Sequence, residues 1–180
     1  KAGTPIIGIC GGYQMLGETI TDSGHESSEG VYQGLGLLKI TTQFSGYEKT
    51  TIQVTRTALN HSPILQRMGS VSGYEIHTGD TSVGDCKSAF DGEGAVSDDG
   101  QIFGTYMHGL FQNKNAVDAL LSCLSEKKGI EYIPAESTNP IYDDTVYDSV
   151  ARQFEMSLDV ETLVAIAKDG IPNTEKQTIS

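Results

Sequence analysis

The chain has 180 residues, of which 24 are acidic and 12 are basic, and its formal net charge is −12 at pH 7. The length suits one domain with a substantial core, and the acidic balance disfavours nucleic acid and anionic membranes as partners. Because the sequence has neither an apolar run near the roughly 20 residues of a membrane span nor a signal-peptide pattern, we expect a soluble, cytoplasmic protein.

The first half of the chain predicts strands joined by polar segments. Residues 5–9 form an apolar run typical of a buried strand, and residues 12–19 predict a short helix. Residues 21–34 are rich in Ser, Gly, Glu and Asp, which is typical of a loop. Three further strands are expected: 35–44, 50–57 and 71–77. Between the last two, residues 60–69 predict a connection in which Pro63-Ile64-Leu65 packs into the core.

The second half of the chain predicts a hairpin followed by a helix. Residues 94–97 and 101–107 read as two strands, and Asp98-Asp99-Gly100 between them supplies the positive φ of a tight turn. Apolar residues fall on one face of a helix over residues 113–128, and Gly129 is its expected stop. The first half and this segment together predict an α/β fold.

The tail of the chain predicts two more helices. They cover residues 145–156 and 159–168, and Asp159 is the expected N-cap of the second, with Thr162 at its third position. The last residues, 173–180, are polar and are expected to be disordered.

One short motif carries the strongest chemical signal. Gly8-Ile9-Cys10-Gly11-Gly12 lies between the first strand and the first helix, and G-x-C-x-G is the thiol form of the nucleophile elbow. The turn is expected to be so tight that only glycines fit beside the cysteine. The helix N-terminus favours a thiolate, so Cys10 is the predicted nucleophile. Because only nine residues precede Cys10, and parallel strands need crossovers of a dozen or more, we expect a fragment of a longer polypeptide.

A cysteine nucleophile needs a base, and four histidines compete for that role: His25, His61, His77 and His108. His25 and His61 lie in polar sequence that is typical of the surface. His108 ends the apolar run 102–107, and a base at the carboxyl edge of a strand can face a nucleophile at the same edge of its neighbour. The sequence therefore predicts His108 as the base.

Three separated segments resemble one enzyme family. Residues 8–14 resemble the nucleophile motif of the class I glutamine amidotransferases, and residues 104–111 are similar to their histidine motif. Between them, Gly-Tyr-Glu-Ile-His-Thr-Gly at 73–79 resembles the C-terminal amidotransferase domain of cobyric acid synthases in particular. The resemblance covers residues 3–128 and implies a flavodoxin-like mixed sheet flanked by helices, lacking its N-terminal strands. This implies an amidotransferase domain at 1–130, a helical extension at 131–172 and a disordered tail at 173–180.

The resemblance also implies a division of labour within one polypeptide. This domain would hydrolyse glutamine through a dyad of Cys10 and His108, and the ammonia would pass to an ATP- and Mg²⁺-dependent synthetase domain that amidates corrinoid carboxylates in cobalamin biosynthesis. No phosphate-binding loop is present, so we expect no cofactor in this chain. The residues implied in binding glutamine or its oxyanion are Gly11, Gln14, Tyr74, Glu75 and His77. A second oxyanion donor is expected upstream of Lys1, so the fragment alone should be weakly active or inactive.

One position departs from the wider family. Many relatives have a glutamate two residues after the histidine, where it orients the ring, but this position is Leu110. The resemblance therefore implies a Cys-His dyad, as in cobyric acid synthases, with His108 oriented by a backbone carbonyl or by another acid. Glu75 is a candidate for that acid.

Other interpretations remain open from the sequence. Cobyrinic acid a,c-diamide synthase and a lipid II amidating subunit have a similar amidotransferase domain, although residues 73–79 and 108–111 favour the cobyric acid synthases. The fold could also serve as a noncatalytic docking module, or the elbow could belong to a thiol hydrolase of the dienelactone type. Cys86 and Cys123 read as packing residues, and three cysteines without metal-ligand spacing predict no metal site. The acidic residues Asp143, Asp144 and Asp148 are more typical of a solvated face than of a metal centre.

Overall fold

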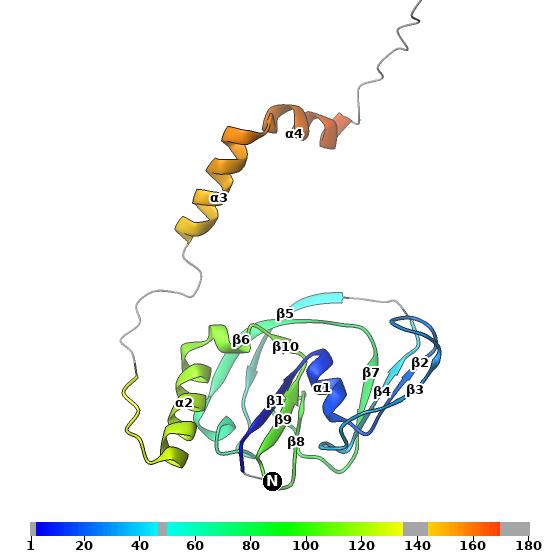
Figure 1. Cartoon of the computed structure of the whole chain (residues 1–180), viewed down its shortest axis with the longest axis vertical. Helices are drawn as coiled ribbons and strands as arrows, with labels where there is room; N and C mark the ends of the chain where they lie inside the picture. The colour runs from blue at the N-terminus through cyan, green and yellow to red at the C-terminus, as the bar shows by residue number, and fades with distance from the viewer. Residues whose placement is uncertain (1–2, 47–49, 135–143, 170–180) are drawn as a thin grey trace, which may run out of the picture. The chain divides into compact units, whose positions relative to one another are not determined.

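The computed structural model of the chain describes residues 3–46, 50–134 and 144–169 (Figure 1). Two units can be distinguished in it, 1–135 and 136–180, and each is described by itself. The first unit contains every strand of the described residues, and it contains the candidate site.

The centre of the first unit is a three-stranded sheet of order β1-β9-β8. Strand β1 (Ile6–Ile9) runs parallel to β9 (Ile102–Thr105), and β8 (Ala95–Val96) pairs with β9 antiparallel. The predicted first strand and the predicted hairpin are therefore confirmed. Gly100 in the hairpin turn has φ +69°, the positive value that the turn requires.

Two helices cover opposite faces of this sheet (Figure 1). Helix α2 (Lys114–Lys128) packs its buried Ala116, Ala119 and Cys123 into the same core cluster as Phe103. Helix α1 (Gly11–Leu16) packs Tyr13 and Leu16 into a second cluster, which Ile102 of β9 adjoins. Because neighbouring strand residues point to opposite faces, each helix receives one set of β9 side chains. This arrangement confirms the mixed α/β class.

A second sheet of order β10-β6-β5 adjoins the end of β9. Strand β6 (Ser70–His77) pairs antiparallel with β5 (Thr50–Thr57) and with the short β10 (Met107–His108), so the predicted strands at 50–57 and 71–77 are confirmed. The connection between β5 and β6 contains the 3-10 turn Leu65–Arg67, and Ile64 and Leu65 are buried as expected.

The prediction of one strand over residues 101–107 is wrong in one respect. The chain leaves the first sheet after Thr105, and Met107 already belongs to the second sheet. Tyr106 lies between the two strands and is buried, with 6% of its surface exposed. The two sheets are therefore joined through a single residue next to the predicted site.

A third sheet, of order β3-β2-β4-β7, contains the main errors of the sequence-based prediction. Residues 21–34 were expected to form a loop, but β2 (Thr19–Asp22) and β3 (Gly30–Gln33) form an antiparallel pair there. Strand β4 (Ile40–Phe44) begins later than predicted, and β7 (Asp80–Val83) was not predicted. Strands β3 and β7 expose most of their side chains, so they lack the apolar alternation that identifies a half-buried strand.

Asp22 organises the turn between β2 and β3. Its carboxylate accepts backbone N–H groups of His25 at 2.7 Å, Glu26 at 3.2 Å and Ser27 at 2.6 Å. These hydrogen bonds favour the charged form and so lower the pKa of Asp22 below its ordinary value. The bond from the His25 N–H has the largest effect.

We expect Asp22→Asn to lower the thermal unfolding midpoint at pH 7. The pKa of Asp22 is lower in the folded state than in the unfolded state. The carboxylate therefore stabilises the fold at pH values above 3.8, its ordinary pKa, and this stabilisation is lost as the pH falls through the folded-state pKa. The difference in midpoint between wild type and variant should therefore shrink in acid. Calorimetry from pH 7 to pH 3 measures it, with Asp98→Asn as the control at an exposed ion pair. A difference that persists unchanged at pH 3 would contradict this explanation.

The second unit is described over two helices, α3 (Asp144–Ser157) and α4 (Val160–Asp169). Both predicted helices are confirmed, and Asp159 accepts the backbone N–H of Thr162 at 3.0 Å and its hydroxyl at 2.7 Å, as an N-cap does. The expected disordered tail, residues 173–180, and Asp143 lie outside the described residues.

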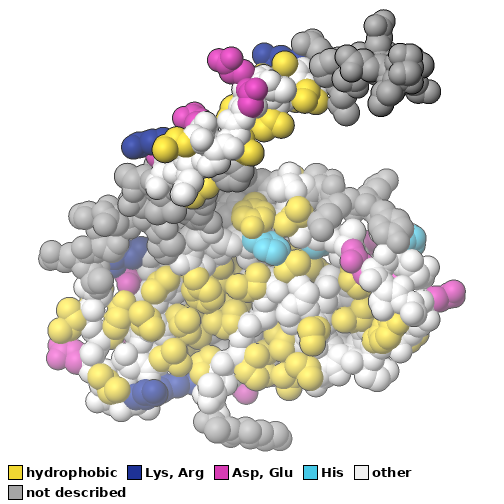
Figure 2. Space-filling view, turned by 45° about the horizontal axis from the view of Figure 1, so that its top comes forward, with side chains coloured by type: hydrophobic (Ala, Val, Ile, Leu, Met, Phe, Trp, Pro, Cys, Tyr) yellow, Lys and Arg dark blue, Asp and Glu magenta, His cyan; other side chains and the backbone are white. Residues whose placement is uncertain are grey.

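The face shown in Figure 2 has broad apolar areas interrupted by few charged side chains, although the chain carries 24 acidic residues. Exposed large apolar side chains of the first unit include Ile6, Met15, Leu35 and Val83. No helix in the described part of the chain is both long enough and apolar enough to cross a bilayer.

Candidate active site

The strand-to-helix turn at Cys10 has the backbone of a nucleophile elbow. Cys10 has φ 54° and ψ −116°, and it is the single non-glycine residue with positive φ in the described ranges. Its N–H donates to the carbonyl oxygen of Thr105 at 2.9 Å, and its own carbonyl accepts the N–H of Gln14 at 3.1 Å. A strained backbone of this kind is typical of functional sites, because the surrounding structure must hold it in place.

The glycines of the elbow are not equivalent. A Cβ at Gly8 would lie 2.6 Å from Leu16 Cδ1 and 2.8 Å from the backbone of Gly12, so β1 and α1 approach each other too closely for any side chain there. A Cβ at Gly11 or Gly12 would meet no atom within 4 Å. The expectation that only glycine fits beside the cysteine therefore holds at Gly8 and is wrong at the two positions after Cys10.

The Cys10 thiol points toward the segment that the sequence singled out in β6. Sγ lies 3.8 Å from the carbonyl oxygen of Ile76, and the thiol is half-buried. Gly11, the predicted oxyanion donor, is the first residue of α1 and is exposed. Since the first N–H groups of a helix have no partner within it, the Gly11 N–H lies at a helix end next to the thiol.

His108 lies in β10 directly opposite Tyr74 of β6. The two rings stack with centroids 5.1 Å apart and an interplanar angle of 12°, so Tyr74 fixes the plane of the imidazole. Within the described part of the chain, the buried Nε2 of His108 has no hydrogen-bond partner. A Cβ at Gly73 would overlap the His108 carbonyl oxygen, which shows how closely β6 passes the base.

Thr105 connects the two predicted catalytic residues. The carbonyl oxygen of Thr105 accepts the Cys10 N–H. His108 lies three residues after Thr105, across the joint between the sheets. No hydrogen bond between Cys10 Sγ and the imidazole occurs among the described residues. Catalytic hydrogen bonds are often long or poorly aligned until the substrate binds. The missing bond between Cys10 and His108 therefore does not exclude either residue from catalysis.

The proposal that Glu75 orients His108 is wrong in geometry. Glu75 pairs with Met107, and because neighbouring strand residues alternate between faces, Glu75 faces away from His108. Its Oε1 instead accepts Arg56 Nε at 2.7 Å, in an ion pair with side-chain exposures of 22% and 10% for Arg56 and Glu75. This hydrogen bond raises the pKa of Arg56. The carboxylate is therefore already paired with Arg56.

Gln14 and His77 both contact Tyr106. Gln14 Nε2 donates to the Tyr106 hydroxyl and to the Thr78 carbonyl, each at 3.1 Å, and the His77 ring stacks on Tyr106 with centroids 3.7 Å apart. The Tyr106 hydroxyl also makes a short hydrogen bond with Thr81, and burial raises the pKa of this phenol. These contacts bring α1 and the end of β6 together around the joint that precedes His108.

A polar hollow opens beside His77. Its volume is about 530 Å³, and acidic side chains and His77 contribute to its wall. The residues around it are Ser45, Gly46, Ile52, Glu75, His77, Gly79 and Asp80. Over the described ranges, no group of three or more His, Cys, Asp or Glu side chains is arranged to hold a metal ion.

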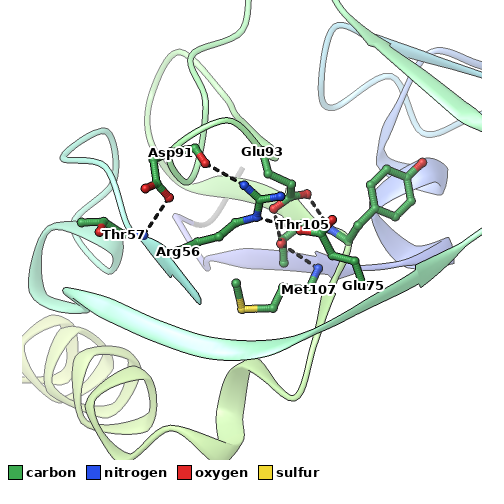
Figure 3. A network of polar contacts seen from close by, with 8 residues as sticks. Arg56, Thr57, Glu75, Asp91, Glu93, Thr105 and Met107 are labelled. Atoms are coloured by element: carbon green, nitrogen blue, oxygen red, sulfur yellow. Dashed lines mark hydrogen bonds and ion pairs between the residues drawn. The ribbon is translucent and has the colours of Figure 1, made fainter. Parts of the chain in front are cut away.

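Glu93 is a half-buried acid that the sequence did not reveal (Figure 3). Its Oε1 accepts the Tyr106 N–H at 2.6 Å and its Oε2 accepts the Thr105 hydroxyl at 2.6 Å. Its pKa is raised, because the cost of burying the carboxylate exceeds the effect of these hydrogen bonds. Glu93 follows Asp91-Gly92, which reads as a polar turn, and no local signal distinguishes it from a surface acid.

Comparison with known proteins identifies the family. Residues 1–116 match the model of the CobB/CobQ-like glutamine amidotransferase domain. Three curated relatives, each named a probable cobyric acid synthase, are similar over most of the chain. That of Methanosphaerula palustris is 52% identical over 172 residues and 96% of this chain, that of Methanoculleus marisnigri 53% over 167 residues and 91%, and that of Methanosarcina barkeri 47% over 169 residues and 92%.

The similarity covers a limited part of those relatives. The chain spans 34% of the length of each of the three proteins. The family match, in contrast, covers well over half of the chain and includes both Cys10 and His108. The chain therefore belongs to the CobB/CobQ-like glutamine amidotransferase domain family.

Proposed function

We propose that Cys10 and His108 act as a catalytic dyad that hydrolyses glutamine to glutamate and ammonia. The observation that carries this proposal is the positive φ of Cys10 at a strand-to-helix elbow, a strained conformation that a packing cysteine does not need. The buried, unpartnered Nε2 of His108 supports it, because a general base needs a ring nitrogen that no other group occupies. Family membership supports it as well.

The reaction balances with these two residues and water. The Cys10 thiolate attacks the carboxamide carbon of glutamine, and the tetrahedral intermediate collapses as His108 gives its proton to the departing ammonia. Water then attacks the glutamyl thioester while His108 takes its proton, which releases glutamate and restores the thiolate. The sum is glutamine plus water to glutamate plus ammonia.

The surrounding groups have assigned parts in this mechanism. The backbone N–H of Gly11 stabilises the oxyanion, because it lies at the first turn of α1 directly after the nucleophile. Gln14 and the β6 segment with Tyr74, Glu75 and His77 contact the substrate, in part through backbone groups such as the Ile76 carbonyl near Sγ.

The ammonia serves the amidation of corrinoid carboxylates in cobalamin biosynthesis, in the cytoplasm. An ATP- and Mg²⁺-dependent synthetase domain of the same polypeptide performs that step, and ATP and Mg²⁺ belong to that domain rather than to this chain. Support comes from the relatives, which are named as probable cobyric acid synthases and are about three times as long as the matched region.

Covalent labelling of the full-length polypeptide tests the dyad. A glutamine-analogue chloroketone should alkylate Cys10 once per chain, and an excess of glutamine should protect it. Cys86, a half-buried thiol in the same chain, is the internal control and should stay unmodified by peptide mass spectrometry. Absence of an adduct at Cys10, or equal labelling of both thiols, would favour a noncatalytic docking module instead.

A further inference from the structure

The joint between the first two sheets is held by side chains. Tyr106 interrupts the strands, so two backbone N–H groups at the joint bond to side chains instead of the sheet ladder. Glu93 Oε1 accepts the Tyr106 N–H at 2.6 Å, and Thr105 Oγ1 accepts the Met107 N–H at 3.0 Å (Figure 3). Buried N–H groups need such partners, so these two bonds determine how the chain crosses from β9 to β10.

The two side chains are also bonded to each other. The Thr105 hydroxyl donates to Glu93 Oε2 at 2.6 Å, and Thr105 is completely buried. With its hydrogen directed to Glu93, the Thr105 oxygen presents a lone pair to the Met107 N–H. We call Glu93 and Thr105 together the joint clamp.

The joint clamp reaches both predicted catalytic residues. On one side, the Thr105 carbonyl accepts the Cys10 N–H at 2.9 Å, which is the bond that anchors the strained elbow to β9. On the other side, the bond to the Met107 N–H fixes the residue immediately before His108. One buried threonine therefore contacts the nucleophile through its backbone and the strand of the base through its hydroxyl.

Glu93 is in turn held by its surroundings. Arg56 Nη1 donates to the Asp91 carbonyl at 2.8 Å, and the Asp91 carboxylate accepts the Thr57 N–H at 2.8 Å, so the loop that carries Glu93 is tied to β5 (Figure 3). Burial raises the pKa of Glu93, and the positive charge of Arg56 opposes this shift only in part.

We propose that Glu93 and Thr105 are positioning residues that set the placement of Cys10 relative to His108. This inference rests on the proposed glutaminase function. Neither side chain touches the substrate in this scheme. They act by fixing the elbow and the base in one arrangement, and a displacement of about 1 Å in such an arrangement can lower the rate about 10²-fold.

The test compares isosteric and conservative variants in the full-length polypeptide. Thr105→Val keeps the shape but removes the hydroxyl, so we expect kcat for glutamine hydrolysis to fall about 10- to 100-fold with KM unchanged. Thr105→Ser restores the hydroxyl and should recover activity to within about threefold of wild type. Glu93→Gln should lower kcat similarly, and the double variant should lose less than the product of the single losses, because the two residues act as a unit. Thr55→Val, at an exposed hydroxyl of β5, is the control.

Three outcomes would overturn the clamp. The first is a kcat for Thr105→Val equal to that of wild type. The second is a fall in kcat that disappears when kcat is divided by the fraction of chains that the chloroketone labels, because such a fall reflects folding alone. The rate of Cys10 alkylation by iodoacetamide, relative to Cys86, gives a readout independent of glutamine. If wild type releases no ammonia from glutamine, the proposed function fails, and the clamp is then tested by the ratio of the two alkylation rates. A change of about threefold or more in this ratio between wild type and Thr105→Val supports the clamp. An unchanged ratio overturns it.

Discussion

Replacing Cys10 by serine should lower glutamine-dependent ammonia release by at least about 10³-fold. Serine has nearly the same shape and can occupy the same backbone conformation, so the elbow and its bond to Thr105 should remain. Its hydroxyl is far less acidic than a thiol and is a weak nucleophile without a strong base. A continuous assay of glutamate or ammonia with the full-length polypeptide measures the loss.

Two controls make this result specific. Cys86→Ser changes a second half-buried thiol and should leave the rate within about twofold of wild type, because surface changes away from the site have small effects. Amidation supported by added ammonium salts should survive in Cys10→Ser, since external ammonia bypasses the step that the thiol performs. Glutamine hydrolysis that persists in Cys10→Ser would contradict the assignment of the nucleophile.

Gly73→Ala should damage both stability and activity. The added methyl group would overlap the His108 carbonyl oxygen and lie 2.8 Å from Met107 Cγ, so β6 and β10 must separate. Overpacking of this kind costs about 1–3 kcal/mol, and we expect the unfolding free energy to fall by that amount. Because the displaced strand carries the base, kcat for glutamine hydrolysis should fall about 10²-fold.

Gly30→Ala is the matched control for this prediction. Gly30 also lies in a strand, and its added methyl group would meet Tyr32 at 3.7 Å, an ordinary van der Waals contact. Denaturant unfolding and steady-state kinetics of both variants provide the comparison. If Gly73→Ala and Gly30→Ala behave alike, the close approach of β6 to His108 is not what constrains the site.

The parts of the fold that the sequence predicted correctly have local signals. The hairpin turn ends in Gly100, which has the required positive φ, and helix α2 ends at Gly129, which has φ 64°. The elbow is specified within five residues, and Cys10 takes the strained conformation that its motif predicts.

The errors arise where local signals are missing. Strand β3 has three exposed residues in four, and β7 also has three, so their stability comes from pairing with β2 and β4 rather than from an apolar face. The break at Tyr106 could not be predicted either, because residues 102–107 are continuous in their apolar character. Which sheet each half joins is decided by partners far away in the chain.

The acids of the site show the same limit. Glu75 lies in a motif, and the sequence makes it a candidate for orienting His108. Its partner is instead Arg56, 19 residues away on the neighbouring strand. Glu93 lies in no motif, yet it accepts hydrogen bonds from Thr105 and from Tyr106 at the joint. Pairings between side chains of distant segments depend on strand register, which a single sequence does not specify.

The strained backbone of Cys10 presents the thiol for reaction but lowers the stability of the fold. A non-glycine residue in so sparsely populated a conformation lowers the stability of the folded state by about 1–3 kcal/mol. Glycine at this position would restore part of that stability but would remove the sulfur. Selection or engineering for heat resistance would thus favour a substitution that ends the chemistry. Attempts to toughen this protein should therefore leave position 10 untouched and seek their gains in regions remote from the elbow.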